Sequence, residues 1–400
     1  MPSLLAWIDH DPAERDRMQR ILALFQERDT RDELGLGAIR DSFADQLFPG
    51  TSTIQTRLRY FLFVPWIYQD LERRQVPSER APTVARQIEL ALAEALIPDG
   101  DWGVFGRTAR GSLKRLPSSV YWAGLKAWGI RRFAGSQEQY HRGLDETYRM
   151  RKAVQRWDEA EGGWPGATET WHPKLPPAPE GFPHRADFRL SPEEVEFLRE
   201  RIATTQPRSL LAYLVLHARP AEVEFPWMHP DYASFPEHSR EMLEHARLFS
   251  QTMQGAAILY NLMLAELAAQ APLVEEHRSG FAQWAEELDV RALRGWDLER
   301  LWALTEGTGH TITRRAKAFV IRWVDLARRE PGRIPELGDA QTLIRLRESI
   351  LKGGRSRFTN RRALEQWSGY AGIRPLNFRW ITVRGFLADL HPAESQVTHA

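Results

Sequence analysis

Two arginine-rich blocks carry the strongest chemical signal in the sequence. Residues 102–156 hold 12 basic and 3 acidic residues, and residues 345–384 hold 10 basic and 2 acidic residues. The guanidinium group of arginine presents a planar fork of donors that suits phosphate oxygens. The sequence therefore predicts contact with nucleic acid, with DNA favoured, through these side chains: Arg107, Arg110, Lys114, Arg115, Trp122, Lys126, Arg131, Arg132, Arg355, Arg357, Arg361 and Arg362.

The two blocks are expected to meet on one exposed face of the folded protein. Trp122 is placed off the apolar face of its expected helix, which makes it the candidate platform for stacking on a base. The acidic region 187–306, with 20 acidic and 11 basic residues, leaves alternatives open. Its carboxylates could pair with the arginines inside the protein, or the region could dock a protein partner of a larger complex. The arginine stems could also cover apolar surface or face an acidic protein.

Four histidines offer a different chemistry. His217, His229, His238 and His245 fall close together, with Asp231, Glu237 and Glu241 nearby. Imidazole and carboxylate groups can bind zinc or manganese without cysteine, so a metal-dependent hydrolase or nuclease is the alternative function. Isolated histidines are more often structural, and the interpretation without a metal is favoured.

No short motif of a known catalytic chemistry is present. The sequence lacks the phosphate loop GxxxxGK[ST], the dinucleotide fingerprint GxGxxG, the nucleophile elbow GxSxG and the zinc motif HExxH. A Cys count of 0 removes disulfides, thiolate metal sites and a cysteine nucleophile. His172 and Lys174 resemble half of an HxK motif, but the aspartate that should follow is missing. We therefore expect no catalytic residue, no cofactor and no metal, and a non-enzymatic role is favoured.

Hydrophobic spacing predicts a mainly α-helical fold. Helices are expected over residues 12–30, 33–48, 81–97, 135–157, 237–270, 281–289, 297–305, 312–329, 340–351, 360–369 and 382–390. The first of them places Met18, Ile21, Leu22, Leu24 and Phe25 on one side. The run Ser191-Pro-Glu-Glu predicts a capped helix start, because Ser, Pro and acids favour the first turn.

Residues 35–63 suggest a helix–turn–helix. A second helix is expected from Thr53, after the turn at residues 49–52. Its polar face could enter a major groove with Thr53, Gln55, Thr56, Arg57 and Arg59. A helical corner without DNA contact is the more common explanation of this pattern.

A proline- and glycine-rich stretch divides the sequence. We expect two helical domains, residues 1–156 and 191–400, joined by a strap over residues 157–190. Aromatic residues in the strap (Trp164, Trp171, Phe182 and Phe188) indicate that it packs against a neighbour.

Three stretches have a family likeness: LLAWIDHDPAERDRMQRILALF (4–25), RDTRDELGLGAIRDSFADQLFPGTSTIQTRLRYFLFVPWIY (28–68) and LKRLPSSVYWAGLKAWGIRRF (113–133). They resemble an uncharacterised family of bacterial proteins, and the resemblance runs over most of the chain. It implies an association with phage-defence or helicase gene neighbourhoods. It supplies no catalytic residues.

Composition agrees with a soluble globular protein. The 400 residues are 42% hydrophobic and carry a net charge of +1. No secretory signal or membrane-spanning run is evident, so a cytoplasmic protein without membrane contact is expected. We interpret the sequence as a nucleic-acid-binding accessory subunit, with an anti-phage defence complex as one setting for it; a protein–protein scaffold is a further alternative.

Overall fold

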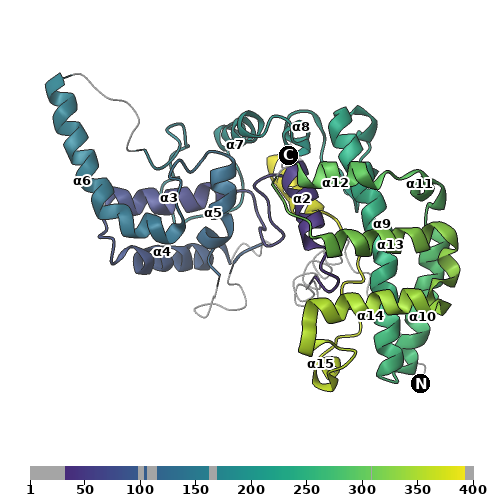
Figure 1. Ribbon diagram of the computed structural model, residues 1–400. Coiled ribbons are helices and arrows are strands. Elements are labelled where there is room, and N and C mark those ends of the chain that lie inside the picture. Colours follow the sequence, from purple (N-terminus) through teal and green to yellow (C-terminus); the bar gives the residue numbers. More distant parts are fainter. Residues whose placement is uncertain (1–31, 98–102, 106–114, 162–168, 308, 392–400) are drawn as a thin grey trace, which may run out of the picture. The chain divides into compact units, whose positions relative to one another are not determined.

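The computed structural model describes residues 32–97, 103–105, 115–161, 169–307 and 309–391. This part of the chain is mainly α-helical and contains no strand (Figure 1). The α-helices are α2 (Gly37–Leu47), α3 (Tyr60–Arg73), α4 (Ala81–Leu96), α5 (Pro117–Ala127), α6 (Gln137–Glu161), α7 (Pro192–Thr205), α8 (Leu210–His217), α9 (Glu237–Leu267), α10 (Ala271–Glu287), α11 (Val290–Gly295), α12 (Leu298–Glu306), α13 (Arg314–Arg329), α14 (Gly338–Lys352), α15 (Arg361–Glu365) and α16 (Trp380–Leu390). Short 3₁₀ helices are η2 (Pro226–Met228), η3 (Tyr232–Ser234), η4 (Pro331–Glu336) and η5 (Gly353–Arg355).

The chain forms two compact units, and each is built from separate stretches of sequence. The first unit contains residues up to Phe43 together with Glu241–Phe378. The second unit contains Ala44–Arg240 and the residues from Arg379 onward. This division differs from the contiguous domains 1–156 and 191–400, and those boundaries stay a prediction.

Most expected helices are present, and their starts follow local chemistry. The Ser191 side chain accepts a hydrogen bond from Glu194 N at 3.2 Å, and Ser191 N donates to the Glu194 carboxylate at 3.1 Å. This capping box starts α7 where the sequence predicted it. The helix expected over 12–30 lies outside the described residues.

The helix expected from Thr53 begins at Tyr60 instead, and the helix–turn–helix interpretation of residues 35–63 is wrong. Thr56 N donates to the Tyr121 hydroxyl at 2.9 Å, so an amide that a helix would use is bound by a side chain.

Three of the polar residues proposed to enter a groove are occupied within the second unit. Gln55 is buried. Arg57 Nε donates to Asp389 at 2.9 Å, and Arg59 Nη2 donates to Glu194 at 2.8 Å. These three side chains stabilise the second unit, and none of them is presented to a ligand.

The first unit is organised around α9. Trp323 of α13 donates to Thr252 O of α9 at 2.8 Å, and Tyr260 of α9 donates to Glu348 of α14 at 3.3 Å. α13 and α14 therefore lie side by side across the long helix (Figure 1).

In the second unit, α3 is the central helix and packs against α4 and α5. Residues of the proline-rich stretch lie on α3: the Phe182 ring is 5.8 Å from Phe63, and Trp66 Nε1 donates to Pro176 O at 2.7 Å. The aromatic residues of this stretch thus contribute to the core of the second unit. None of the helices within the described ranges is long and apolar enough to cross a membrane.

Candidate functional site

The structure separates the predicted contact residues by exposure. The exposed ones are Arg115, Lys126, Arg132, Arg355, Arg361 and Arg362. Arg107, Arg110 and Lys114 lie outside the described residues. Trp122, Arg131 and Arg357 are buried or half-buried, and their placement corrects the sequence-based prediction.

Trp122 does not offer a stacking face. Its side chain is 8% exposed and packs among the rings of Tyr68, Tyr140 and Trp171, with centroids 5.3, 5.6 and 6.0 Å away. The guanidinium of Arg131 lies 4.6 Å from the Trp122 ring centroid. The sequence placed Trp122 outside the apolar face of its helix, but the neighbouring α6 and residue Trp171 cover it.

Arg131 is also an interior residue. Its guanidinium donates to three backbone carbonyls: Trp122 O at 3.2 Å, Gly135 O at 2.8 Å and Phe133 O. Burial lowers the pKa of Arg131 to about 10, so the group stays charged at neutral pH. Arg131 closes the turn after α5 and is not available to phosphate.

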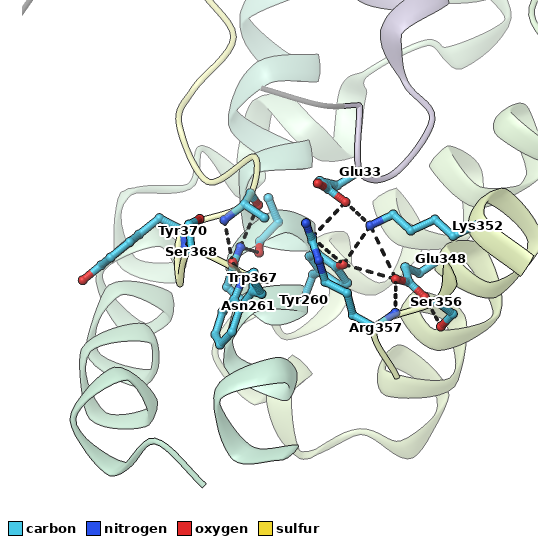
Figure 2. A network of polar contacts seen from close by, with 12 residues as sticks. Glu33, Tyr260, Asn261, Glu348, Lys352, Ser356, Arg357, Trp367, Ser368 and Tyr370 are labelled. Atoms are coloured by element: carbon cyan, nitrogen blue, oxygen red, sulfur yellow. Dashed lines mark hydrogen bonds and ion pairs between the residues drawn. The ribbon is translucent and has the colours of Figure 1, made fainter. Parts of the chain in front are cut away.

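Arg357 belongs to a buried network of charged and polar groups in the first unit (Figure 2). Its guanidinium lies 3.0 Å from Glu33 and donates to the Tyr260 hydroxyl at 3.1 Å. Lys352 Nζ also donates to Glu33 and lies 3.5 Å from Glu348. Two carboxylates therefore face two cations.

The charged and polar groups of this network pair with one another and hold the segment after α14 in place. Glu348 accepts from Ser356 Oγ and from Arg357 N, the latter at 2.8 Å. Burial raises the pKa of Tyr260 well above its usual range, so the hydroxyl stays protonated. Because each named group has a partner within the network, we interpret it as fixing the segment after α14 on α9. That segment carries the exposed Arg355.

A second polar cluster holds the loop after α15. The Asn261 amide oxygen accepts from Trp367 Nε1 at 3.0 Å and from Ala371 N at 2.8 Å (Figure 2). Asn261 Nδ2 donates to Ala371 O at 2.8 Å. The two clusters together give the region 353–371 a fixed position on α9.

An arginine-rich face lies next to this region. α13 presents Arg314, Arg315 and Arg322 on its exposed side, and α14 presents Arg345. Arg347 of α14 lies 5.4 Å from the ring of Phe319 in α13, so the turn that carries Arg345 is beside the middle of α13. The name "arginine face" is used below for the exposed Arg314, Arg315 and Arg322 of α13 and Arg345 of α14, together with Arg355 and Arg362 of the segment after α14.

Within the described chain, the arginine face is not neutralised. Arg314, Arg315, Arg322, Arg355 and Arg362 have no carboxylate partner among the described residues. Arg345 lies 5.1 Å from the Phe358 ring and likewise has none there.

Among the other exposed arginines of the same unit, Arg291, Arg329 and Arg374 likewise have no carboxylate partner in the described chain, whereas others do. Arg300 pairs with Glu241 at 2.6 Å, and Arg333 pairs with Glu330 at 3.2 Å. The arginine face thus combines three exposed cations on one side of α13 with an absence of carboxylate partners in the described chain.

Four residues of the arginine face were not among the predicted contact residues: Arg314, Arg315, Arg322 and Arg345. Arg314, Arg315 and Arg322 lie just before the second basic block, within a stretch that also holds acidic residues. The signal that could have found them is helical spacing: Arg315 and Arg322 are seven positions apart, which places them on one side of a helix. A count of net charge by region does not detect such a stripe.

The described part of the first basic block, residues 102–156, offers fewer unpaired cations to a ligand than the arginine face does. Arg132 pairs with Glu169, and Lys126 Nζ donates to Arg132 O at 3.4 Å. Arg115 is exposed and has no carboxylate partner in the described chain. This block lies in the second unit, whereas most of residues 345–384 lie in the first. The convergence of the two blocks on one face stays a prediction.

The four histidines do not assemble a metal site. No group of three or more histidine, aspartate or glutamate side chains within the described ranges could hold a metal ion. His229 Nε2 lies 3.2 Å from Arg219 O, and His245 Nδ1 accepts from Trp296 Nε1 at 2.9 Å. Burial lowers the pKa of His245. Each of these two imidazoles is thus engaged locally.

A hollow of about 520 Å³ in the first unit lies beside His245. Of the three carboxylates that line it, Glu244 pairs with Arg247 at 2.6 Å. The other two cap helices: Asp289 accepts from Ala292 N at 2.9 Å, and Asp297 accepts from Arg300 N at 3.1 Å. Their geometry is explained by α11 and α12, and the hollow has no assembled catalytic group among the residues described.

The fold and the site together define a mainly α-helical protein whose described part has an unneutralised arginine face and no metal-binding group. The chain belongs to the family of unknown function DUF6361, whose model matches residues 2–394. No curated protein and no solved structure matches the chain. The likeness to an uncharacterised family is therefore confirmed.

Proposed function

We propose that this protein binds nucleic acid, with duplex DNA favoured, as a non-enzymatic accessory subunit. The observation that carries the proposal is the arginine face of α13 and α14. Arg314, Arg315 and Arg322 are exposed on one side of α13 and have no carboxylate partner in the described chain. Unpaired guanidinium groups on a firm helical surface can replace the counterions of a phosphate backbone.

The dimensions of the face suit a duplex. α13 has 16 residues, which gives a length of about 24 Å at 1.5 Å per residue. The three α13 members of the arginine face span eight residue steps from Arg314 to Arg322, about 12 Å, which is about one third of a duplex turn of roughly 34 Å. The cations extend along the sides of two packed helices, so contact with the backbone is favoured over reading of bases.

The proposed accessory role also involves the acidic region. The acidic region 187–306 would repel the same polyanion and is the surface proposed to dock a protein partner. Membership of an anti-phage defence complex is part of this proposal and rests on the family resemblance alone.

Fluorescence anisotropy with a labelled 30-base-pair duplex tests the proposal. The variant Arg314→Ala/Arg315→Ala/Arg322→Ala should weaken binding and reduce the slope of log affinity against log salt. The expected reduction is about 0.9 for each phosphate that the variant no longer neutralises. Single-stranded DNA and RNA of the same sequence establish which nucleic acid binds best.

A matched control removes the same charge elsewhere. Arg73, Arg142 and Arg333 are exposed, but they pair with Asp70, Glu138 and Glu330. Their triple alanine variant should keep most of the affinity. Equal losses for the two triple variants would show that only net charge matters, and absence of binding at low salt to all three probes would overturn the proposal.

A further inference from the structure

The outer side of α14 carries aliphatic residues without a cover in the described chain. Leu346, Ile350 and Leu351 are 51%, 43% and 41% exposed. Leu346 and Ile350 are one helical turn apart and so lie on the same face. Adjacent exposed aliphatic side chains of this kind typically mark a contact surface. These three residues are called the α14 ridge below.

The described chain begins beside the C-terminal end of this ridge. Arg347 donates to Leu34 O at 2.7 Å and to Gly35 O at 2.9 Å. Gly35 has a φ of +65°, and a Cβ built on it would lie 2.7 Å from Leu351 Cδ2. The backbone at Gly35 thus touches the ridge, and the preceding 31 residues must leave from this point.

Those preceding residues contain an apolar stripe. Met18, Ile21, Leu22 and Phe25 follow helical spacing. The family model matches from residue 2, so this stretch belongs to the sequence that the family shares. A stripe of this kind requires an apolar partner surface.

We propose that the stripe of residues 18–25 docks on the α14 ridge of the same chain. Phe25 is seven residues before Asp32, a tether of up to about 25 Å. The ridge from Leu346 to the end of α14 at Lys352 measures only about 9 Å. A tether this short gives an effective concentration on the order of millimolar, which favours the chain's own segment over a second copy or a separate protein. The docking does not depend on nucleic-acid binding.

Disulfide trapping tests the contact, because the chain has a Cys count of 0. The pair Leu22→Cys/Leu346→Cys in the full chain should oxidise to a cross-linked monomer, seen as a faster band on a non-reducing gel. The control pair Leu22→Cys/Ser279→Cys uses an exposed residue of α10 and should stay reduced under the same conditions. Position 346 is half-exposed, so the substitution should leave the fold intact.

Thiol labelling provides a second measurement. A docked segment that leaves the ridge open about 10% of the time slows labelling of Leu346→Cys about tenfold. Deletion of residues 2–30 should therefore raise that rate about tenfold and leave labelling of Ser279→Cys unchanged. Cross-linked dimers would assign the ridge to a second copy and overturn the proposal. Absence of a cross-link with an unchanged labelling rate would also overturn it, since residues 18–25 would then not cover the ridge.

Discussion

The guanidinium of Arg357 lies 3.0 Å from the carboxylate of Glu33, which joins two residues from opposite ends of the first unit's sequence. The same carboxylate accepts a hydrogen bond from Lys352. Arg357 is 14% exposed, and its pKa is raised by Tyr260 and Glu33 against the lowering effect of burial. This residue was expected to contact nucleic acid, but its position makes it part of the anchor for the segment after α14.

Arg357→Ala should therefore destabilise the protein. The substitution leaves Glu33 with only Lys352 and removes a donor from the Tyr260 hydroxyl. Breaking a buried ion pair costs about 3–5 kcal/mol, and the remaining lysine should hold the loss near the lower value. The free energy of unfolding from urea denaturation measures the effect.

Arg355→Ala is the matched control for this prediction. Arg355 is two positions away, exposed and without a carboxylate partner in the described chain. Its substitution should change the free energy of unfolding by less than about 0.5 kcal/mol. Similar losses for the two variants would contradict the anchoring role of Arg357.

Arg131→Leu should destabilise the second unit and leave nucleic-acid affinity unchanged. The substitution removes donors to the carbonyls of Trp122, Phe133 and Gly135 and leaves those acceptors buried. A hydrogen bond to a charged group contributes about 1.5–3 kcal/mol, so we expect a loss of at least that size. Thermal unfolding measures stability, and anisotropy below the unfolding transition measures affinity. A large loss of affinity in the folded variant would restore Arg131 to the interface.

Local sequence chemistry predicted much of the fold. Apolar residues at helical spacing located α9 and α13, and the serine at position 191 located the start of α7. These features depend on residues within one or two turns of each other, which is the range over which a sequence pattern acts. Gly129, just after α5, has a φ of +64°, the left-handed conformation that glycine commonly adopts where a helix ends.

Features set by distant partners were not predicted. Thr56 N is bound by Tyr121, 65 positions away, and this contact prevents the helix expected from Thr53. Trp122 is covered by Trp171, which no local pattern relates to it. Only Arg355 and Arg362 of the arginine face were among the predicted contact residues, because its α13 members lie outside the basic block in sequence.

Glu89 should make stability depend on pH. It is buried on α4 and accepts from Ser118 N at 2.9 Å and from Ser118 Oγ at 2.7 Å. Burial raises its pKa from 4.5 to about 7. The folded protein therefore holds this proton more tightly than the unfolded chain, so stability falls as pH rises from 4.5 through 7. The full loss above that range is on the order of 3 kcal/mol.

Glu89→Gln should remove this dependence, because the amide stays neutral and can still bond to Ser118. The variant should be more stable than the parent at about pH 8 and nearly equal to it at about pH 5. Urea denaturation at the two pH values measures the difference. Glu94→Gln, at an exposed position of the same helix, is the control and should follow the parent at both. Parallel pH profiles of the parent and Glu89→Gln would contradict the prediction.

The arginines after α14 should contact phosphates and not bases. Arg355 is exposed at the end of η5, and Arg361 is 91% exposed with only the surface partner Glu365 at 3.0 Å among the described residues. Such an exposed pair contributes about 0–1 kcal/mol and opens readily when a phosphate competes. Arg355→Ala/Arg361→Ala should thus weaken binding by the same factor for unrelated duplexes and lower the salt slope by up to about two. Anisotropy titrations on three duplexes of different sequence measure this, and a loss confined to one duplex would indicate base reading instead.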